Sequence, residues 1–417
     1  MTRSRSVVLF FLVVAGSAAR PELSRAQTLT GIFDMRVLSA SGSADGLKKQ
    51  RLTRDDQPLA LGQALLEIRG DLSSTVTARA TGALYDSADP SAGVTEAFLE
   101  IHPVPRSAWR WRSRIGAFYP ALSIENTSAG WTSPYTLSFS AVNTWFAEEI
   151  RAQGAEVDLE RMGRFVGSAS DFGLTGAVFR GNDPAGALLS WRGFALHDRQ
   201  TRLFERLDLA SLPAFAPGGS FFPVQGAFEK PFVELDGRWG YWLGARWSHL
   251  GASQLSATYY DNRGDPAVVK DGQWTWRTRF GHLSWHWRPS EQIDILAQAL
   301  DGDTEMDGFT GPLVHAKFWA AYLLASRTWG PHRLSVRIDG FGIADADSTP
   351  DDPNQEHGAA VTAAYFFLLS NAVERRGNWR FGLELLSIRS DRPARRLLRE
   401  PARGRETSAQ LTAQWRF

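Results

Sequence analysis

The sequence predicts an all-β fold, a transmembrane antiparallel β-barrel of about 16 strands with long extracellular loops. Many segments alternate apolar and polar residues, aromatic residues gather near the ends of these segments, and an apolar export signal precedes them. In the segment 334–340, Leu334, Val336 and Ile338 lie on one face and polar residues on the other. Because successive strand side chains point to opposite faces, such segments form sheets with one apolar and one polar side.

The composition excludes several classes of protein. Lys and Arg number 46 against 45 Asp and Glu, so the net charge of +1 lacks the basic excess of a nucleic-acid binder, and we expect no nucleic-acid partner. There is no cysteine, which excludes disulfide scaffolds, cysteine nucleophiles and thiolate metal sites. A mean hydropathy of -0.25 excludes a polytopic helical membrane protein.

Residues 1–26 are typical of a secretory signal peptide. A positively charged start precedes ten apolar residues (7–16), and Ala26 is a small residue at which signal peptidase would cut. The alternative is a membrane anchor, but an anchor needs roughly 20 apolar residues, and Arg20 interrupts the stretch. We expect one mature barrel domain, 27–417, in the bacterial outer membrane.

The length of the alternating segments favours a membrane barrel over a soluble sandwich, which alternates in the same way. Many segments run for 10–14 residues, near the roughly 9–11 that a tilted strand needs to cross a bilayer. We expect strands at 29–39, 61–71, 74–86, 94–104, 108–118, 151–161, 169–181, 238–249, 252–262, 273–286, 291–301, 313–328, 331–343, 358–371, 377–390 and 406–417. Short turns and long loops alternate between them, and 302–312 is one of the long loops. A change of apolar face in 273–286 predicts a bulge near Gly281.

The last segment alternates up to a terminal Phe417. A terminal phenylalanine on an alternating strand resembles the closing strand of bacterial outer-membrane barrels, which implies recognition by the barrel-assembly machinery. The expected partners are outer-membrane lipid, lipopolysaccharide and small solutes.

The polar face of these strands is expected to line the lumen. Arginines follow one another on 108–118, acidic residues on 151–161, and further charges lie on 61–71, 94–104 and 331–343. The predicted pore-lining residues are Arg110, Arg112, Arg114, Glu67, Arg69, Glu96, Glu100, Glu156, Asp158 and Arg337. Rings of charge set the ion preference of a pore. The same residues are equally compatible with a network of interior salt bridges.

Three loops carry unusual composition. The loops 119–150 and 182–237 exceed the roughly 12–15 residues of ordinary connections and carry many apolar residues. We expect at least one of them to fold into the barrel mouth, the alternative being a packed external cap. The loop 391–405 holds six arginines and either faces anionic lipopolysaccharide or is a solvated basic loop.

The segment Arg114–Glu125 (RIGAFYPALSIE) resembles the strand-to-loop junction of the phosphate-selective porin family, an R/G-x-F-x-P-x-S-x-E pattern that leads into a constricting loop. The resemblance implies an outer-membrane porin and a homotrimer. The sequence departs from the family in lacking a lysine-rich loop stretch and in placing acidic residues in the lumen.

The sequence offers no enzymatic motif, and we expect no catalytic residues, metal or cofactor. The one cluster of candidate catalytic groups is Ser190 with His197 and Asp198. The leading hypothesis is passive diffusion of small hydrophilic or charged solutes. The alternatives are a substrate-selective transporter for an aromatic or hydrophobic compound and a closed structural barrel.

Overall fold

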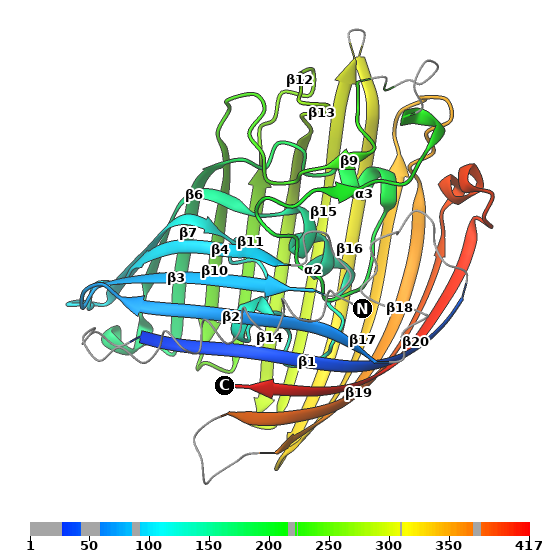
Figure 1. The fold of residues 1–417 in the computed structure, drawn as a ribbon. Coiled ribbons are helices and arrows are strands. Elements are labelled where there is room, and N and C mark those ends of the chain that lie inside the picture. Colours follow the sequence, from blue (N-terminus) through cyan, green and yellow to red (C-terminus); the bar gives the residue numbers. More distant parts are fainter. Residues whose placement is uncertain are drawn as a thin grey trace.

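Sixteen antiparallel strands close into one barrel in the computed structural model (Figure 1). The structure describes residues 27–42, 59–85, 92–215, 222, 224–308, 311–369 and 377–417. The first strand pairs with the last, for example Phe33 with Trp415, and this pairing closes the barrel. The predicted signal peptide, 1–26, lies outside the described residues.

Each of the sixteen predicted segments overlaps one barrel strand, so the expected number and order of strands are confirmed. The strands are β1 (Gln27–Gly42), β2 (Ala60–Asp71), β3 (Val76–Leu84), β4 (Ala92–Ile101), β5 (Trp109–Phe118), β6 (Ala152–Arg161), β7 (Ser170–Arg180), β10 (Gly240–His249), β11 (Ser253–Asp261), β14 (Arg277–Ser290), β15 (Ile293–Gly308), β16 (Gly311–Trp329), β17 (His332–Asp345), β18 (Glu356–Leu369), β19 (Asn378–Asp391) and β20 (Arg403–Arg416).

Short elements lie in the connections between barrel strands. They are the helices α2 (Ala141–Glu149) and α3 (Ala187–Arg192), the 3-10 turns η2 (Ala129–Trp131), η3 (Gly163–Val166), η4 (Pro213–Phe215) and η5 (Pro393–Leu398), and the strand pairs β8 (Leu207–Asp208) with β9 (Phe228–Glu229) and β12 (Val269–Lys270) with β13 (Gln273–Trp274). No helix in the described residues is long and apolar enough to span a membrane.

Two sequence predictions about β14–β16 are wrong. The segment 302–312 is not a long loop, because β15 and β16 remain paired from Ile293 with Arg327 up to Gly308 with Gly311. The bulge near Gly281 is absent, since pairing with both neighbouring strands runs unbroken through this residue. The apparent change of face arises because Phe280 points into the barrel, where it meets α2.

The outer face is an apolar belt between two aromatic girdles. On β16, Trp319 and Trp329 both point outward and lie ten residues apart, which on a tilted strand corresponds to a band roughly 25 Å tall. Exposed aliphatic side chains fill the band, among them Leu174, Leu243, Leu283, Ile338, Val361 and Leu411. A closed barrel with such a belt is built for a bilayer, as in bacterial outer-membrane proteins.

The two ends of the barrel differ. At one end, called here the turn end, the connections are short, as at 250–252 and 330–331. At the other end, called the loop end, lie the long connections, including 119–151 and 181–239. Figure 1 shows α2 and α3 inside the outline of the barrel rather than beyond its rim.

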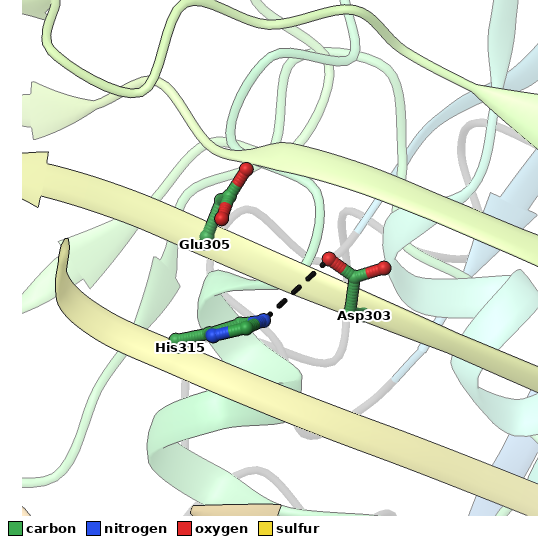
Figure 2. Close-up of side chains that lie close together, drawn as sticks. All are labelled: Asp303, Glu305 and His315. Carbon is green, nitrogen blue, oxygen red and sulfur yellow. Dashed lines mark ion pairs between the residues drawn. The ribbon is translucent and has the colours of Figure 1, made fainter. Parts of the chain in front are cut away.

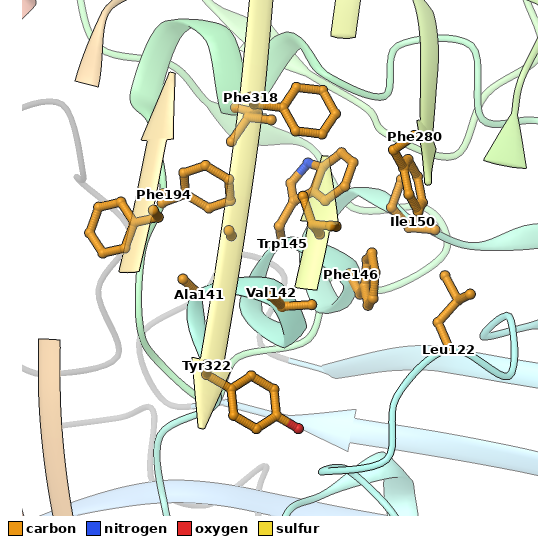
Figure 3. Close-up of a cluster of buried hydrophobic side chains, with 14 of the residues drawn as sticks. Leu122, Ala141, Val142, Trp145, Phe146, Ile150, Phe194, Phe280, Phe318 and Tyr322 are labelled. Atoms are coloured by element: carbon orange, nitrogen blue, oxygen red, sulfur yellow. The ribbon is translucent and has the colours of Figure 1, made fainter. Parts of the chain in front are cut away.

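Both long segments pack inside the barrel, which confirms the prediction that at least one enters it. In α2, the Trp145 ring lies 5.0 Å from that of Phe318 and 5.2 Å from that of Phe280, between centroids (Figure 3). Burying a side chain of this size contributes roughly 1.5–3 kcal/mol. The inner wall therefore carries apolar residues where β14–β17 meet α2, although the polar face of the strands was expected to line the lumen.

Candidate functional site

Three ion pairs form a ladder on the inner wall between β5 and β6. The pairing places Arg110 opposite Glu160, Arg112 opposite Asp158, and Arg114 opposite Glu156. Arg114 Nε lies 2.9 Å from Glu156 Oε1 and Arg112 Nη2 lies 3.4 Å from Asp158 Oδ1, while Arg110 pairs with Glu160. The predicted arginine and acidic rows are thus brought together.

The members of each pair differ in their exposure. The side chains of Arg110, Arg112 and Arg114 are 37%, 41% and 20% exposed, whereas those of Glu160, Asp158 and Glu156 are 9%, 12% and 5% exposed. Arg246 on β10 also approaches Asp158, at 3.4 Å. In each pair the guanidinium group is therefore the more exposed member and the carboxylate the more buried one.

Two of the predicted pore-lining carboxylates accept hydrogen bonds from backbone amides of the first inserted segment. Glu67 accepts a hydrogen bond from the Gly130 amide at 3.2 Å, and Glu96 accepts one from the Tyr119 amide at 2.9 Å. Both amides belong to the inserted segment 119–151. The predicted residues Glu100 and Arg69 make ion pairs on the same wall, with Arg79 at 2.9 Å and with Asp71 at 3.6 Å respectively.

Arg337 lies fully buried beneath the segment 119–151. Its Nη1 lies 2.6 Å from Glu125 Oε1 and its Nε lies 2.8 Å from Asp339 Oδ2. The same guanidinium donates to the carbonyl oxygens of Ser138 and Phe139, at 2.7 and 3.0 Å. Arg337 thus anchors the inserted segment to the wall.

Sequence reasoning missed the partners of this anchor. Glu125 closes the RIGAFYPALSIE segment, and the pattern gave no sign that its carboxylate reaches an arginine 212 residues away. Glu384 on β19 accepts hydrogen bonds from the amides of Leu137 and Ser138. Asp339 accepts one from the Ala141 amide at 3.0 Å, at the start of α2.

The second inserted segment is tied to the first. Glu149, at the end of α2, accepts hydrogen bonds at 2.9–3.1 Å from the amides of Gly186, Leu188 and Leu189, at the start of α3. Gly186 has φ +101°, and a Cβ there would lie 2.1 Å from Thr304 Oγ1 on the wall, so only glycine fits. The two segments act as one inserted body.

In the candidate catalytic cluster of Ser190, His197 and Asp198, the histidine and the aspartate form ion pairs with residues outside the cluster. His197 Nε2 lies 2.8 Å from Glu148 Oε1, and Glu148 also pairs with Arg192. Asp198 pairs with Arg36 on β1. The imidazole and the Asp198 carboxylate therefore engage different structural partners.

Two carboxyl groups, those of Glu149 and Glu229, are both fully buried between the inserted segments. Burial raises the pKa of Glu149 and raises that of Glu229 still further, with the Glu149 charge adding to the shift on Glu229. Arg192 opposes both shifts. Burial thus disfavours the ionised form of Glu229 more strongly than that of Glu149.

A pH-sensitive contact lies within the second inserted segment. Burial, together with the nearby charges of Glu234 and Asp236, raises the pKa of Asp183 to about 7, and its carboxyl accepts hydrogen bonds from the Leu235 and Asp236 amides. A raised carboxyl pKa favours the folded state while the group is protonated, so this stabilisation is lost as pH rises from about 4 to 7.

We therefore expect the amides of 233–237 to exchange hydrogen faster at pH 8 than at pH 5, after correction for the intrinsic pH dependence of exchange. In Asp183→Asn this difference should disappear, because the amide does not titrate. A corrected rate that is the same at both pH values in the wild type would contradict the prediction.

A cluster on the outer face at the loop end has donor atoms suited to a metal ion. Figure 2 shows Asp303 and Glu305 of β15 beside His315 of β16, with His315 Nε2 3.6 Å from Asp303 Oδ2. Arg279 already binds both Asp303 oxygens, at 2.8 and 3.0 Å. The cluster is a charge-balanced surface patch.

The loop of six arginines divides into two groups. Arg392 and Arg395 are buried and donate to backbone carbonyls, Arg392 to Ser190 at 2.6 Å and Arg395 to Ala402 at 2.9 Å. Of the two alternatives for this loop, solvation does not hold for Arg392 and Arg395. The exposed arginines are Arg396, Arg399, Arg403 and Arg405.

Comparison with known proteins identifies the fold. No protein-family model and no curated protein matches the chain. The outer membrane channel DcaP of Acinetobacter baumannii matches with a TM-score of 0.52 at 10% identity, over 95% of this chain and 99% of that chain. The anion-selective porin from Comamonas acidovorans matches with a TM-score of 0.50 at 12% identity, over 94% and 100%. OmpT, an outer membrane protein of Vibrio cholerae in its trimer form, matches with 0.50 at 9%, over 94% and 99%. The chain thus has the barrel fold of outer-membrane porins.

Proposed function

We propose that the chain is a non-enzymatic outer-membrane porin that admits small hydrophilic solutes by passive diffusion and prefers anions. The observation that carries the proposal is the ladder of Arg110, Arg112 and Arg114, whose guanidinium groups face the lumen while their carboxylate partners lie behind them. Fixed positive charge at the water-facing surface attracts anions and repels cations. The neighbour described as an anion-selective porin has the same fold.

The inserted segments make the passage narrow. Every residue of 137–152 is buried, and α2 packs on β15–β17. The aromatic side chains of the first segment are held in this packing, which disfavours a transporter that would bind aromatic compounds with them. The same packing favours one second candidate, a closed structural barrel.

Uptake into liposomes tests the proposal. Liposomes that contain the purified, folded protein should swell in small sugars, and the rate should fall steeply as the sugar grows, because the inserted segments leave a narrow path. Protein-free liposomes are the control. Swelling no faster than the control in the smallest sugar would exclude a pore and favour the closed barrel.

The homotrimer and the recognition of Phe417 by the assembly machinery stay predictions. The Phe417 carbonyl accepts a hydrogen bond from the Gly31 amide at 2.9 Å, which pins the chain end beside β1.

A further inference from the structure

Three basic side chains gather on the outer face of β18–β20 at the loop end. The pairing places Arg389 of β19 directly opposite Arg405 of β20, and Asp391 opposite Arg403. All three arginines are exposed, and Arg403 Nε lies 2.9 Å from Asp391 Oδ2. These side chains point away from the lumen, because the intervening Ser390 is buried on the inner side.

Arg389 and Arg405 are left uncompensated. Like charges directly opposite one another on neighbouring strands destabilise a sheet. Neither arginine makes an ion pair with a carboxylate among the residues that the structure describes. Along 389–405 seven arginines face only two acidic residues, so the local charge is strongly positive. Two positive charges therefore face each other directly across β19 and β20.

A hollow lies at this point. It has a volume of about 410 Å³ and is lined by His357, Arg389, Asp391, Arg403 and Arg405. Toward the middle of the membrane belt a second hollow of about 400 Å³ follows on β18–β20 and the adjoining strand β1. Hydroxyl and apolar side chains line the second hollow, namely Ser39, Ser41, Val361, Leu385, Ser387 and Thr407.

From the loop end toward the middle of the belt, the surface offers first cationic side chains and then hydroxyl and apolar side chains. A phosphorylated lipid presents its phosphate, backbone and acyl chains in the same order. Guanidinium groups bind phosphate through charge-assisted, often bidentate, hydrogen bonds. The hydroxyls of Ser387 and Thr407 suit the ester or amide oxygens of a lipid backbone, and Leu385 and Val361 suit an acyl chain. We propose that β18–β20 bind a phosphorylated, multiply acylated glycolipid, the lipid A part of lipopolysaccharide, with its phosphate between Arg389 and Arg405.

The charged patch on β14–β16 provides a matched contrast. There Arg279 and Lys317 flank Asp303 in the pairing, and Arg279 binds its carboxylate. Both cations point outward at the same end of the barrel, yet a carboxylate lies between them. The patch therefore offers no vacant position for a phosphate.

The test titrates the full-length folded protein in detergent with lipid A and counts bound lipids by native mass spectrometry. Removing two basic side chains, as in R389Q/R405Q, should weaken binding roughly thirtyfold. R279Q/K317Q should bind as the wild type does, and R389K/R405K, which keeps the charge, should retain most of the binding. The folded state of each variant is checked by its heat-modifiable mobility.

Two further probes separate the phosphate and acyl contributions. Dephosphorylated lipid A with the same acyl chains should bind the wild type as weakly as lipid A binds R389Q/R405Q, and inorganic phosphate alone should bind far more weakly than lipid A. Equal lipid A affinity in the wild type and R389Q/R405Q would overturn the proposal. Binding of inorganic phosphate as tight as that of lipid A would also overturn it. The same holds if lipid A is found bound only to oligomers of the protein and never to the single chain. None of these readouts depends on whether the lumen conducts.

Discussion

Replacing Arg337 by alanine should release the segment 119–151 from the wall. The substitution leaves the carboxylates of Glu125 and Asp339 buried without their cation and removes two hydrogen bonds to backbone carbonyls. Breaking a buried ion pair by removing one partner costs about 3–5 kcal/mol. We expect the free energy of local opening around Ser138 to fall by about this amount, as measured by amide hydrogen exchange.

Arg327→Ala on the neighbouring strand β16 is the control, because Arg327 is exposed. Exposed substitutions usually change stability by less than about 0.5 kcal/mol. A released segment should also make the ionic current larger and noisier. Unchanged exchange at Ser138 in Arg337→Ala would show that Glu384 and the packing of α2 hold the segment without this anchor.

The double variant R110Q/R112Q should lose much of the preference for anions. The two guanidinium groups are the most exposed members of the ladder, and a unit charge a few ångströms from an ion in water contributes about 1 kcal/mol. We expect the chloride-to-potassium permeability ratio to fall roughly fivefold or more. The ratio is obtained from the reversal potential in a salt gradient.

The opposite change supplies the control. In D158N/E160Q the carboxylates behind the ladder become neutral, so the same guanidinium groups act unopposed and the permeability ratio should rise. Equal ratios in the wild type and both double variants would mean that ions do not pass this wall, and that the ladder only stabilises the pairing of β5 with β6.

The strands could be predicted from the sequence because a bilayer imposes the same alternation on every strand. An outward residue such as Ile338 must be apolar, and its inward neighbours Arg337 and Asp339 are released from that constraint. The ladder could be predicted for the same reason, since both of its rows follow the alternation. The pairing of β5 with β6 then placed Arg112 opposite Asp158.

The interior could not be predicted in the same way. Periodicity tells which side of the sheet a residue faces and not what fills the space inside. Phe280 and Phe318 are apolar and point inward, because the Trp145 ring of α2 lies against them. Arg337 was predicted to line the pore, but its side chain is fully buried against Glu125, a residue in a loop far away in the sequence.

The reversal potential of the wild-type protein in a planar bilayer tests the central claim most directly, that water and ions pass a wall on which arginines are exposed and carboxylates recessed. With a tenfold potassium chloride gradient, we predict stepwise openings whose reversal potential is shifted from zero toward the chloride equilibrium potential. A reversal potential shifted toward the potassium equilibrium potential would contradict the role of the ladder. The absence of any stepwise current from folded protein would contradict the pore itself.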